Sequence, residues 1–300
     1  MSPLLPAIPS PDAWPSAHAL PLDAWLPALR ALESSFALPA SAWERLSGGE
    51  DSAVFASGAS VVKLVPPFLS ADAERETGVL RRLELPVPVP RLAGVTAIEG
   101  WTAIHVNRLS GAPAADVWSS LDRRARLAVM EEIGRVLAAI RLTRLAPEDG
   151  DATALMAKLR ARALRHESAG FAGVDAFLDR HLPAAPHVAF VHFDLNTGNV
   201  MLGDGPDGPV VTGVLDFVAS RAFHPAFDLI APGLFFALGD AGLLGAMLRT
   251  AGLGELAPEE LAAWHLVHPF SDLARDLRMA GRRAPDGDLE AAVVDLWRAA

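Results

Sequence analysis

The sequence predicts an α+β fold with two lobes. The small N-terminal lobe is expected to hold an antiparallel β-sheet with one key helix, and the larger C-terminal lobe to be mainly helical. Two observations support this prediction. Short runs rich in β-branched residues, separated by glycine turns, occupy much of the chain before residue 107. From residue 107 onward, apolar residues recur mainly at the spacing of amphipathic helices.

The first part of the chain is rich in proline and contains no Lys or Arg before Arg30. A secretory signal needs a basic start and an uninterrupted apolar centre, so none is expected here. Residues 1–20 are instead predicted to form an extended arm. Trp25, Leu29 and Leu32 are spaced to form one stripe of a helix over residues 22–36. The N-terminal lobe is assigned to residues 21–106 and the C-terminal lobe to 107–300.

A meander of three antiparallel strands is predicted between Trp43 and Val65. The glycine turn in this meander includes Gly48, Gly49 and Ser52. Lys63 lies in the middle of the third strand, between apolar neighbours. A lysine buried there would need a partner or a ligand, whereas a lysine on the exposed face of an edge strand would not. The strand alone leaves both possibilities open.

A helix is predicted over residues 70–83, and Glu76 near its middle is the expected counter-ion of Lys63, with Glu74 as the competing candidate. A proline-rich connector should end this helix, because proline cannot continue a helical hydrogen-bond ladder. Two more strands are expected at residues 92–97 and 101–108. The change in pattern near Asn107 marks the lobe boundary, and the crevice between lobes is the expected ligand site.

Polar residues in the second lobe follow two apolar runs that resemble buried strands. Asp194 and Asn199 follow the first run, and Asp216 ends the second. A hairpin signal over residues 203–208 should bring Asn199 and Asp216 together. Long helices are expected on either side of this region. The apolar window 229–248 is interpreted as a buried helix pair and not as a membrane span, because it contains Pro232 and Asp240.

Composition narrows the possible functions. The formal charge is −10, which makes the chain a poor general binder of nucleic acid. The chain has no cysteine, which excludes disulfides, thiolate zinc sites and a cysteine nucleophile. A cytoplasmic protein with no membrane or nucleic-acid partner is therefore expected.

Six motifs form one pattern when they are taken in chain order. They are the glycine turn, Lys63, Glu76, the stretch His192-Phe193-Asp194 to Asn199, Leu215-Asp216-Phe217, and Pro225 to Leu229. This pattern resembles the eukaryotic-like kinase fold and, within it, the aminoglycoside phosphotransferase family. The resemblance covers roughly residues 40–280 and is strongest between 191 and 229. Several motifs in the right order make a chance match improbable.

The resemblance implies a small-molecule kinase that uses ATP or GTP and Mg²⁺. It implies that Lys63 holds the nucleotide phosphates and that Glu76 orients Lys63. Asp194 would take the proton of the acceptor hydroxyl, while Asn199 and Asp216 would bind Mg²⁺. The resemblance also implies that a turn containing Gly48, Gly49 and Ser52 binds the nucleotide phosphates. His192 and Asp228 would brace the catalytic loop.

Three features depart from the family pattern. The glycine turn carries Glu50 and Asp51, two acids close to where phosphates would bind. Phe193 stands where a small residue, often glycine, is usual, and Phe217 where many relatives carry tryptophan. The short stretch between Phe217 and Pro225 leaves no room for a protein-kinase activation segment. This favours a small-molecule acceptor over a protein substrate.

The acceptor is expected to be an aminoglycoside-like or another hydroxylated antibiotic. Asp272 and Asp276, one helical turn apart, would suit an ammonium-bearing acceptor, but a solvated helix surface fits the same spacing. A metabolite kinase of the choline, homoserine, fructosamine or sugar type remains an alternative, as does a non-catalytic nucleotide-binding protein. His265 and His268 lack a third metal ligand in register and are interpreted as structural.

Overall fold

A computed structural model describes residues 3–8, 10–40, 42–47, 49, 51–183, 187–206, 208–282 and 288–298. The chain forms two compact units. Unit 1 consists of Met1–Leu83 and Val89–Leu109, and unit 2 of Glu84–Pro88 and Ser110–Ala300. The α+β fold class is confirmed, with an antiparallel sheet in unit 1 and a mainly helical unit 2.

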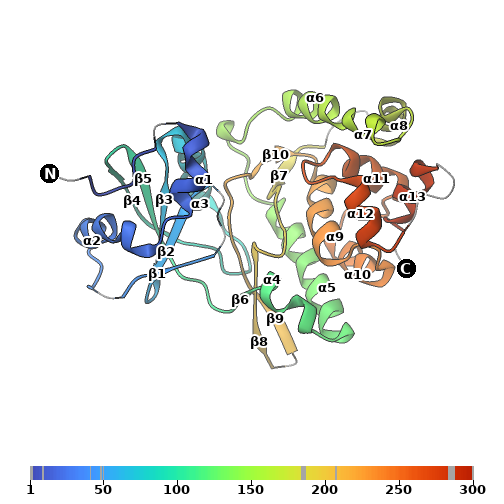
Figure 1. Ribbon diagram of the computed structural model, residues 1–300. Helices are drawn as coiled ribbons and strands as arrows, with labels where there is room; N and C mark the ends of the chain where they lie inside the picture. The colour runs from blue at the N-terminus through green and yellow to red at the C-terminus, as the bar shows by residue number, and fades with distance from the viewer. Residues whose placement is uncertain are drawn as a thin grey trace. The chain divides into compact units, whose positions relative to one another are not determined.

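Unit 1 is built on a five-stranded antiparallel sheet in the order β1-β2-β3-β5-β4 (Figure 1). Its strands are β1 (Glu44–Arg45), β2 (Ala53–Ser57), β3 (Ser60–Val65), β4 (Leu92–Ile98) and β5 (Trp101–Asn107). Strand β3 pairs with β2 on one side and β5 on the other, so Lys63 lies opposite both Val54 and Ile104. Lys63 is therefore in an interior strand and not in an edge strand.

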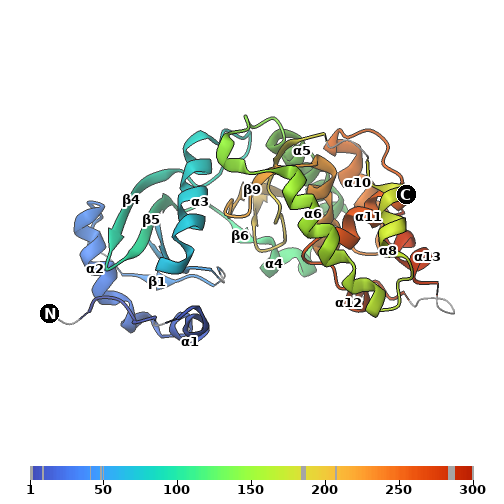
Figure 2. The ribbon, with the colours of Figure 1, turned by 90° about the horizontal axis from the view of Figure 1, so that it is seen from above.

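Each face of this sheet is covered (Figure 2). On one face, Val62 and Leu64 of β3 join a buried cluster with Trp25 and with Leu29 of α2 (Leu26–Ser35). On the other, α3 (Ser70–Arg82) follows a short 3-10 turn, η3 (Pro67–Leu69). The buried positions of α3 recur at helical spacing and are Ala73, Glu76, Thr77, Val79 and Leu80. The sheet therefore has two buried faces, which explains why β3 is almost continuously apolar.

The prediction of an extended arm over residues 1–20 is wrong. These residues contain a 3-10 turn, η1 (Pro11–Ala13), and a short helix, α1 (Trp14–His18), and a second turn, η2 (Leu22–Ala24), leads into α2. Prolines lie in the first positions of η1 and α1, where the helix needs no N–H donor and proline is tolerated. Leu5, Trp14 and Ala17 are buried in the same cluster as Trp25, so apolar packing outweighs the proline signal.

We expect Trp14→Ala to destabilise the protein by about 3 to 5 kcal/mol, as is typical when a buried tryptophan is truncated. The Trp14 ring is 7% exposed and lies 5.9 Å from the Trp101 ring. Denaturant unfolding measures the effect, with Leu142→Ala as a control because Leu142 is 81% exposed. If both variants unfold at the wild-type denaturant concentration, the N-terminal residues are not part of the core.

Unit 2 contains two small sheets, a three-stranded one in the order β6-β8-β9 and a two-stranded one made of β7 and β10. The strands are β6 (Ala112–Pro113), β7 (Ala189–Val191), β8 (Val200–Gly205), β9 (Gly208–Val214) and β10 (Arg221–Phe223). Val200 pairs with Val214 in the β8–β9 hairpin, which brings the residues just outside it together. Leu215 N donates to Asn199 O at 2.8 Å.

The rest of unit 2 is mainly helical (Figure 1). The α-helices are α4 (Ala114–Val117), α5 (Arg123–Ile140), α6 (Ala152–Ala163), α7 (Arg165–Ser168), α8 (Val174–His181), α9 (Ile230–Phe236), α10 (Ala241–Ala251), α11 (Pro258–Val267), α12 (Leu273–Met279) and α13 (Leu289–Asp295). Shorter 3-10 turns are η4 (Trp118–Ser120), η5 (Pro147–Asp149) and η6 (Pro225–Leu229).

Helices α5 and α10 pack closely at Gly134. A Cβ at that position would lie 2.0 Å from Thr250 Oγ1 and 2.4 Å from Met247 O, so only glycine permits this approach. The apolar window 229–248 forms α9 and most of α10, and the Asp240 side chain caps α10. Across the described residues, none of the helices has the length and apolar character needed to cross a membrane.

Candidate active site

Lys63 and Glu76 form a buried ion pair in unit 1. Lys63 Nζ lies 2.6 Å from Glu76 Oε1 and 2.7 Å from Oε2, and the two side chains are 16% and 5% exposed. The competing candidate, Glu74, is exposed. Glu76 shares the inward face of α3 with Ala73 and Leu80, so helical periodicity selects it. The pair holds an ammonium group in a fixed position, because a charge desolvated to this degree needs a partner.

The turn before β2 requires glycine at position 49. Gly49 has φ +77°, and a Cβ there would lie 3.1 Å from both Ser52 O and Val54 Cγ2. Ser52 N donates to Gly49 O at 3.3 Å, and Ser52 O lies 3.2 Å from His18 Nε2. Ser52 is buried at 4% exposure. The sequence assigned Gly48 to the same turn, but Gly48 lies outside the described residues, as does Glu50.

Phe193, in the loop between β7 and β8, has a backbone conformation that is uncommon for a residue with a side chain. Its φ is +75°, in the region that favours glycine. Asp228 holds this backbone in place, because its carboxylate accepts the N–H groups of His192 and Phe193, each at 2.7 Å. The Phe193 ring packs 4.6 Å from the Phe227 ring, and Arg221 lies 4.4 Å above it. Together these contacts stabilise a backbone conformation that would otherwise raise the free energy of the folded state.

His192 connects two loops and is fully buried. Its Nε2 lies 2.9 Å from Leu215 O, and its Nδ1 accepts the N–H of Asp194 at 3.3 Å. A carbonyl can only accept, so Nε2 carries the proton and Nδ1 is the acceptor. Burial lowers the pKa of His192 to about 4, so the ring is neutral at pH 7. These contacts suit a residue that braces the loop.

The backbone segments of Asn199 and Asp216 lie next to each other beside the same loop. The Asn199 amide donates from Nδ2 to Asp194 O at 2.8 Å, so its oxygen Oδ1 is the atom that can coordinate a cation. Leu215, the residue before Asp216, donates its N–H to Asn199 O. Asp216 itself has φ +60°, a conformation that Asp and Asn tolerate better than most residues. The hairpin of β8 and β9 therefore brings the backbone segments that carry Asn199 and Asp216 side by side in unit 2.

Asn196 is a further residue of this loop, and the sequence interpretation missed it. Its Nδ2 donates to Asp194 Oδ1 at 2.6 Å. The available signal was an asparagine two residues after the aspartate in a polar loop, a position where local side-chain hydrogen bonds are common.

The predicted acidic pair for an ammonium-bearing acceptor is wrong. Asp276 is 1% exposed and pairs with His265 Nε2 at 2.9 Å and with Arg275 Nε at 2.8 Å. Asp272 is exposed, but its carboxylate accepts the N–H of Arg275 as the N-cap of α12. Because α12 begins at Leu273, the two acids do not form one open helix face. Each has an internal partner that the sequence spacing alone could not reveal.

His265 is held from two sides, by Asp276 and by Trp297 Nε1 at 3.2 Å, and His268 is buried against Phe227.

In the part of the chain that the structure describes, no cluster of three or more His, Cys, Asp or Glu side chains could hold a metal. A cation at Asn199 and Asp216 would therefore need further oxygen ligands from a phosphate or from water, which is usual for Mg²⁺.

Stability should fall as pH is lowered from 7 to 5. Burial is the largest cause of a lowered pKa at five histidines. The pKa falls to about 4 at His166, His192 and His224 and to about 3 at His268, and it is also lowered at His105. Between pH 6.5 and 4 the unfolded chain therefore binds protons that the folded chain excludes, and unfolding becomes easier. Burial also raises the pKa of Asp228 to about 7. That shift favours the folded state at low pH, but it belongs to a single group, whereas five histidines act in the opposite direction. Urea unfolding at both pH values tests this, and equal or greater stability at pH 5 would contradict it.

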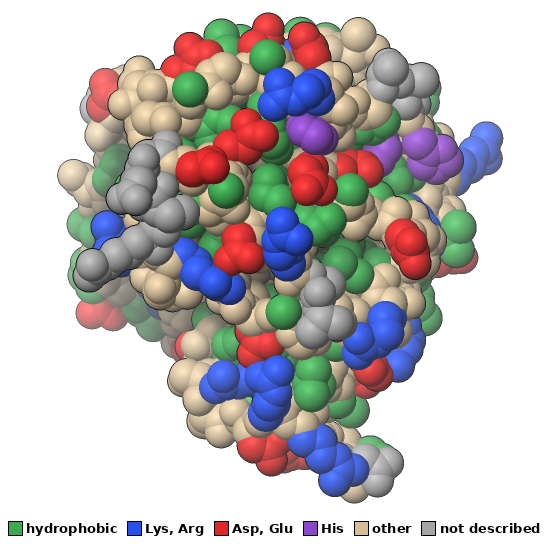
Figure 3. Space-filling model, turned by 90° about the vertical axis from the view of Figure 1, so that its right-hand side faces the viewer, with side chains coloured by type: hydrophobic (Ala, Val, Ile, Leu, Met, Phe, Trp, Pro, Cys, Tyr) green, Lys and Arg blue, Asp and Glu red, His purple; other side chains and the backbone are tan. Residues whose placement is uncertain are grey.

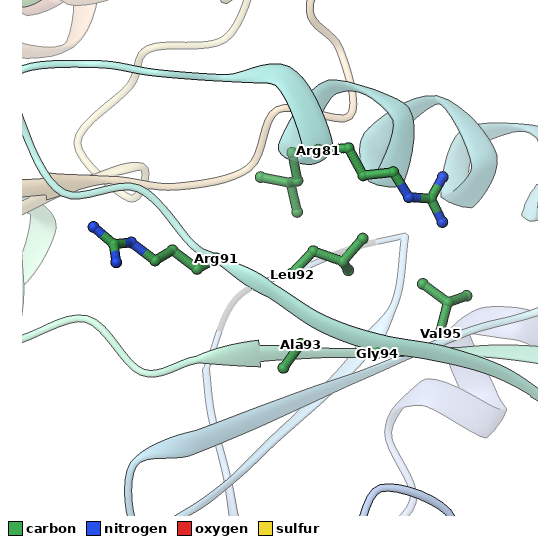
Figure 4. A pocket seen from close by; sticks show the side chains of 7 residues that line it. Arg81, Arg91, Leu92, Ala93, Gly94 and Val95 are labelled. Carbon is green, nitrogen blue, oxygen red and sulfur yellow. The ribbon is translucent and has the colours of Figure 1, made fainter.

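A shallow hollow of about 470 Å³ lies on unit 1 between the C-terminal end of α3 and β4 (Figure 4). Leu92 points toward α3, whereas the guanidinium groups of Arg81 and Arg91 extend in opposite directions. A binding site needs polar groups that converge, so we do not include this hollow in the candidate site.

Comparison with known proteins identifies the family. A sequence model of the phosphotransferase enzyme family matches residues 42–276. The chain belongs to this family. It is therefore a phosphotransferase with a hydroxyl group as acceptor, as the sequence predicted. A search of curated proteins found no match.

Solved structures of phosphotransferases share the fold. The GDP complex of aminoglycoside 2'-phosphotransferase-IIIa is 14% identical with a TM-score of 0.62, and the match covers 91% of this chain and 96% of that one. Macrolide 2'-phosphotransferase MphH from Brachybacterium faecium is 18% identical, with a TM-score of 0.57 and coverage of 90% and 97%. A mutant of aminoglycoside phosphotransferase APH(4)-Ia with ADP and hygromycin B is 18% identical, with a TM-score of 0.58 and coverage of 89% and 97%.

Proposed function

We propose that this phosphotransferase moves the γ-phosphate of ATP or GTP to a hydroxyl group of an aminoglycoside-like or other hydroxylated antibiotic. The observation that carries the proposal is the catalytic loop of unit 2. There Asp194, Asn199 and the Asp216 segment are joined by hydrogen bonds, and Asp228 and His192 hold the loop from behind. A carboxylate beside two oxygen donors suits a reaction that needs a base and a hard cation.

Asp194 acts as the base in this proposal. It takes the proton of the acceptor hydroxyl while the acceptor oxygen forms a bond to the γ-phosphorus. The bond between that phosphorus and the bridging oxygen of the nucleotide breaks, and the nucleoside diphosphate leaves. Asp194 is half-buried, so a small hydroxyl can reach it. His192 is neutral and buried and serves to hold the loop, not to transfer a proton.

Lys63 and Glu76 serve the nucleotide. The ammonium group of Lys63, fixed by Glu76, contacts the phosphates, and the turn that contains Gly49 and Ser52 adds to their binding. Asn199 and Asp216 would hold Mg²⁺, which would supply charge neutralisation for the phosphates. Structures of similar proteins contain GDP, ADP or ATP, which supports a nucleotide as the phosphate donor. Both adenine and guanine nucleotides therefore remain candidate donors.

The acceptor is a small molecule. Acidic and basic side chains are interspersed on the face shown in Figure 3, and the net charge is −10, which disfavours nucleic acid as a partner. Proteins of similar fold have been solved with kanamycin, streptomycin and hygromycin B. Because Asp276 is buried and paired, a cationic acceptor cannot depend on an Asp272–Asp276 face here. We place the reaction in the cytoplasm, where nucleoside triphosphates are available.

A steady-state assay tests the function. Release of nucleoside diphosphate is followed with ATP or GTP, Mg²⁺ and a panel that contains aminoglycosides, macrolides, choline and homoserine. We expect at least one hydroxylated antibiotic to stimulate turnover above the rate without acceptor. Stimulation only by a metabolite would reassign the acceptor class. Nucleotide binding without stimulation by any compound would indicate a non-catalytic nucleotide-binding protein.

A further inference from the structure

The side chain of Asn196 makes two short hydrogen bonds inside the catalytic loop. Its Nδ2 donates to Asp194 Oδ1 at 2.6 Å, and its Oδ1 accepts the N–H of Gly198 at 2.7 Å. The backbone of the loop adds bonds of Asn196 N to Asp194 O at 3.0 Å and of Asn199 N to Asn196 O at 3.1 Å. Asn196 thus connects the carboxylate of Asp194 to the backbone on the far side of the turn.

The orientation of the Asn196 amide follows from these partners. A backbone N–H can only donate, so the atom facing Gly198 must be the amide oxygen. The NH₂ group is then directed at Asp194, where it meets a carboxylate oxygen that accepts. A Cβ at position 198 would lie 3.1 Å from Asn196 Oδ1, so the loop is closely packed around the amide. Asn196 therefore presents a neutral donor to Asp194 in one fixed direction.

We propose that Asn196 is a positioning residue for Asp194, an inference that rests on the proposed phosphotransfer function. By donating to Oδ1, the Asn196 amide holds the plane of the Asp194 carboxylate at a set angle. A misplacement of about 1 Å in a catalytic group can cost roughly 100-fold in rate, so this contact has a measurable effect.

The neutrality of Asn196 matters because other acids lie close to the loop. Asp228 is near enough for the charge of Asp194 to raise its pKa, and Asp216 acts electrostatically on His192. The groups on the other sides are the neutral ring of His192 and Arg221, which lies over Phe193. An aspartate at position 196 would put a second carboxylate oxygen at the 2.6 Å contact. Two carboxylates at hydrogen-bond distance cannot easily both be ionised.

Two substitutions of Asn196 distinguish a role in orienting Asp194 from a role only in stabilising the loop. Asn196→Asp keeps the shape and the acceptor for Gly198 but replaces the donor to Asp194 with a negative charge. Asn196→Leu removes both hydrogen bonds at similar size. Asp122→Asn is the control, because Asp122 Oδ1 accepts Ala125 N at 2.8 Å at the exposed start of α5 and an asparagine can do the same. Rates are normalised to the nucleotide-binding capacity of each preparation, so partial misfolding does not alter kcat.

For Asn196→Leu we expect kcat to fall roughly 10- to 100-fold with nucleotide affinity unchanged, in line with the loss of a residue that orients a reactive group. For Asn196→Asp we expect, in addition, that the acidic limb of the kcat pH profile moves up by about one unit or more, as a shared proton between carboxylates requires. Asp122→Asn should match wild type in both measurements.

The outcomes distinguish this inference from the function on which it depends. If wild type shows acceptor-stimulated turnover that Asp194→Ala abolishes, the function stands. A wild-type kcat and an unmoved pH limb in both Asn196 variants would then overturn the positioning role alone. If wild type has no turnover with any acceptor, the phosphotransfer function fails first, and the positioning role fails with it.

Discussion

Asp194→Ala is expected to lower acceptor-stimulated kcat by about 10²- to 10⁴-fold, the usual contribution of a positioned general base. Nucleotide affinity should stay close to that of wild type, because the proposed partner of the Asp194 side chain is the acceptor hydroxyl and not the phosphates. Steady-state kinetics give kcat, and isothermal titration with nucleotide and Mg²⁺ gives the affinity.

Two further variants make this result specific. Asp194→Asn preserves the size of the side chain but cannot accept the proton, so it should lose nearly as much activity. Asp204→Ala removes an exposed acid from β8, in the hairpin that follows the loop, and should keep wild-type kinetics. Full activity in Asp194→Asn would show that Asp194 does not serve as the base.

Asp216→Asn is expected to weaken nucleotide binding in the presence of Mg²⁺ by roughly 10- to 100-fold, a range typical when a metal site loses an interaction of this kind. Asparagine is the sharper substitution here, because it tolerates the φ of +60° at this position better than alanine. It also removes the charge that attracts the cation. Titrations with and without Mg²⁺ separate the metal-dependent part of the affinity.

Asp204→Asn provides the matched control, since it removes the same charge from the nearby hairpin. The contrast between the two sites is the important part of the test. If Asp194→Ala and Asp216→Asn change Mg²⁺-dependent nucleotide affinity equally, the assignment of Asp194 to the acceptor and Asp216 to the cation is wrong.

Local patterns predicted much of the site. The pairing of Lys63 with Glu76 could be anticipated because a lysine inside an apolar strand needs a counter-ion. Helical spacing places Glu76 on the same face as Ala73 and Leu80. The hairpin was predictable from its glycine-rich turn, and it fixes which residues of the two strands are adjacent.

Features set by tertiary partners were not predictable from local patterns. Proline in the first positions of α1 permits a helix, but only the packing of Trp14 against Trp101 shows that the helix forms and is buried. Asp276 is paired with His265, a residue of the preceding helix, so spacing on its own helix was misleading. The backbone conformation of Phe193 depends on the hydrogen bonds that the N–H groups of His192 and Phe193 donate to Asp228, which lies far along the chain.

The central claim is that this chain transfers a phosphoryl group to a small hydroxylated molecule with Asp194 as the base. The most direct test incubates wild type and Asp194→Asn with γ-labelled ATP or GTP, Mg²⁺ and each compound of the acceptor panel, and identifies labelled products by mass spectrometry. We expect wild type to form a labelled phosphate ester of at least one hydroxylated antibiotic and Asp194→Asn to form almost none. Equal ester formation by both proteins, or nucleotide binding by wild type with no ester from any compound, would contradict the claim.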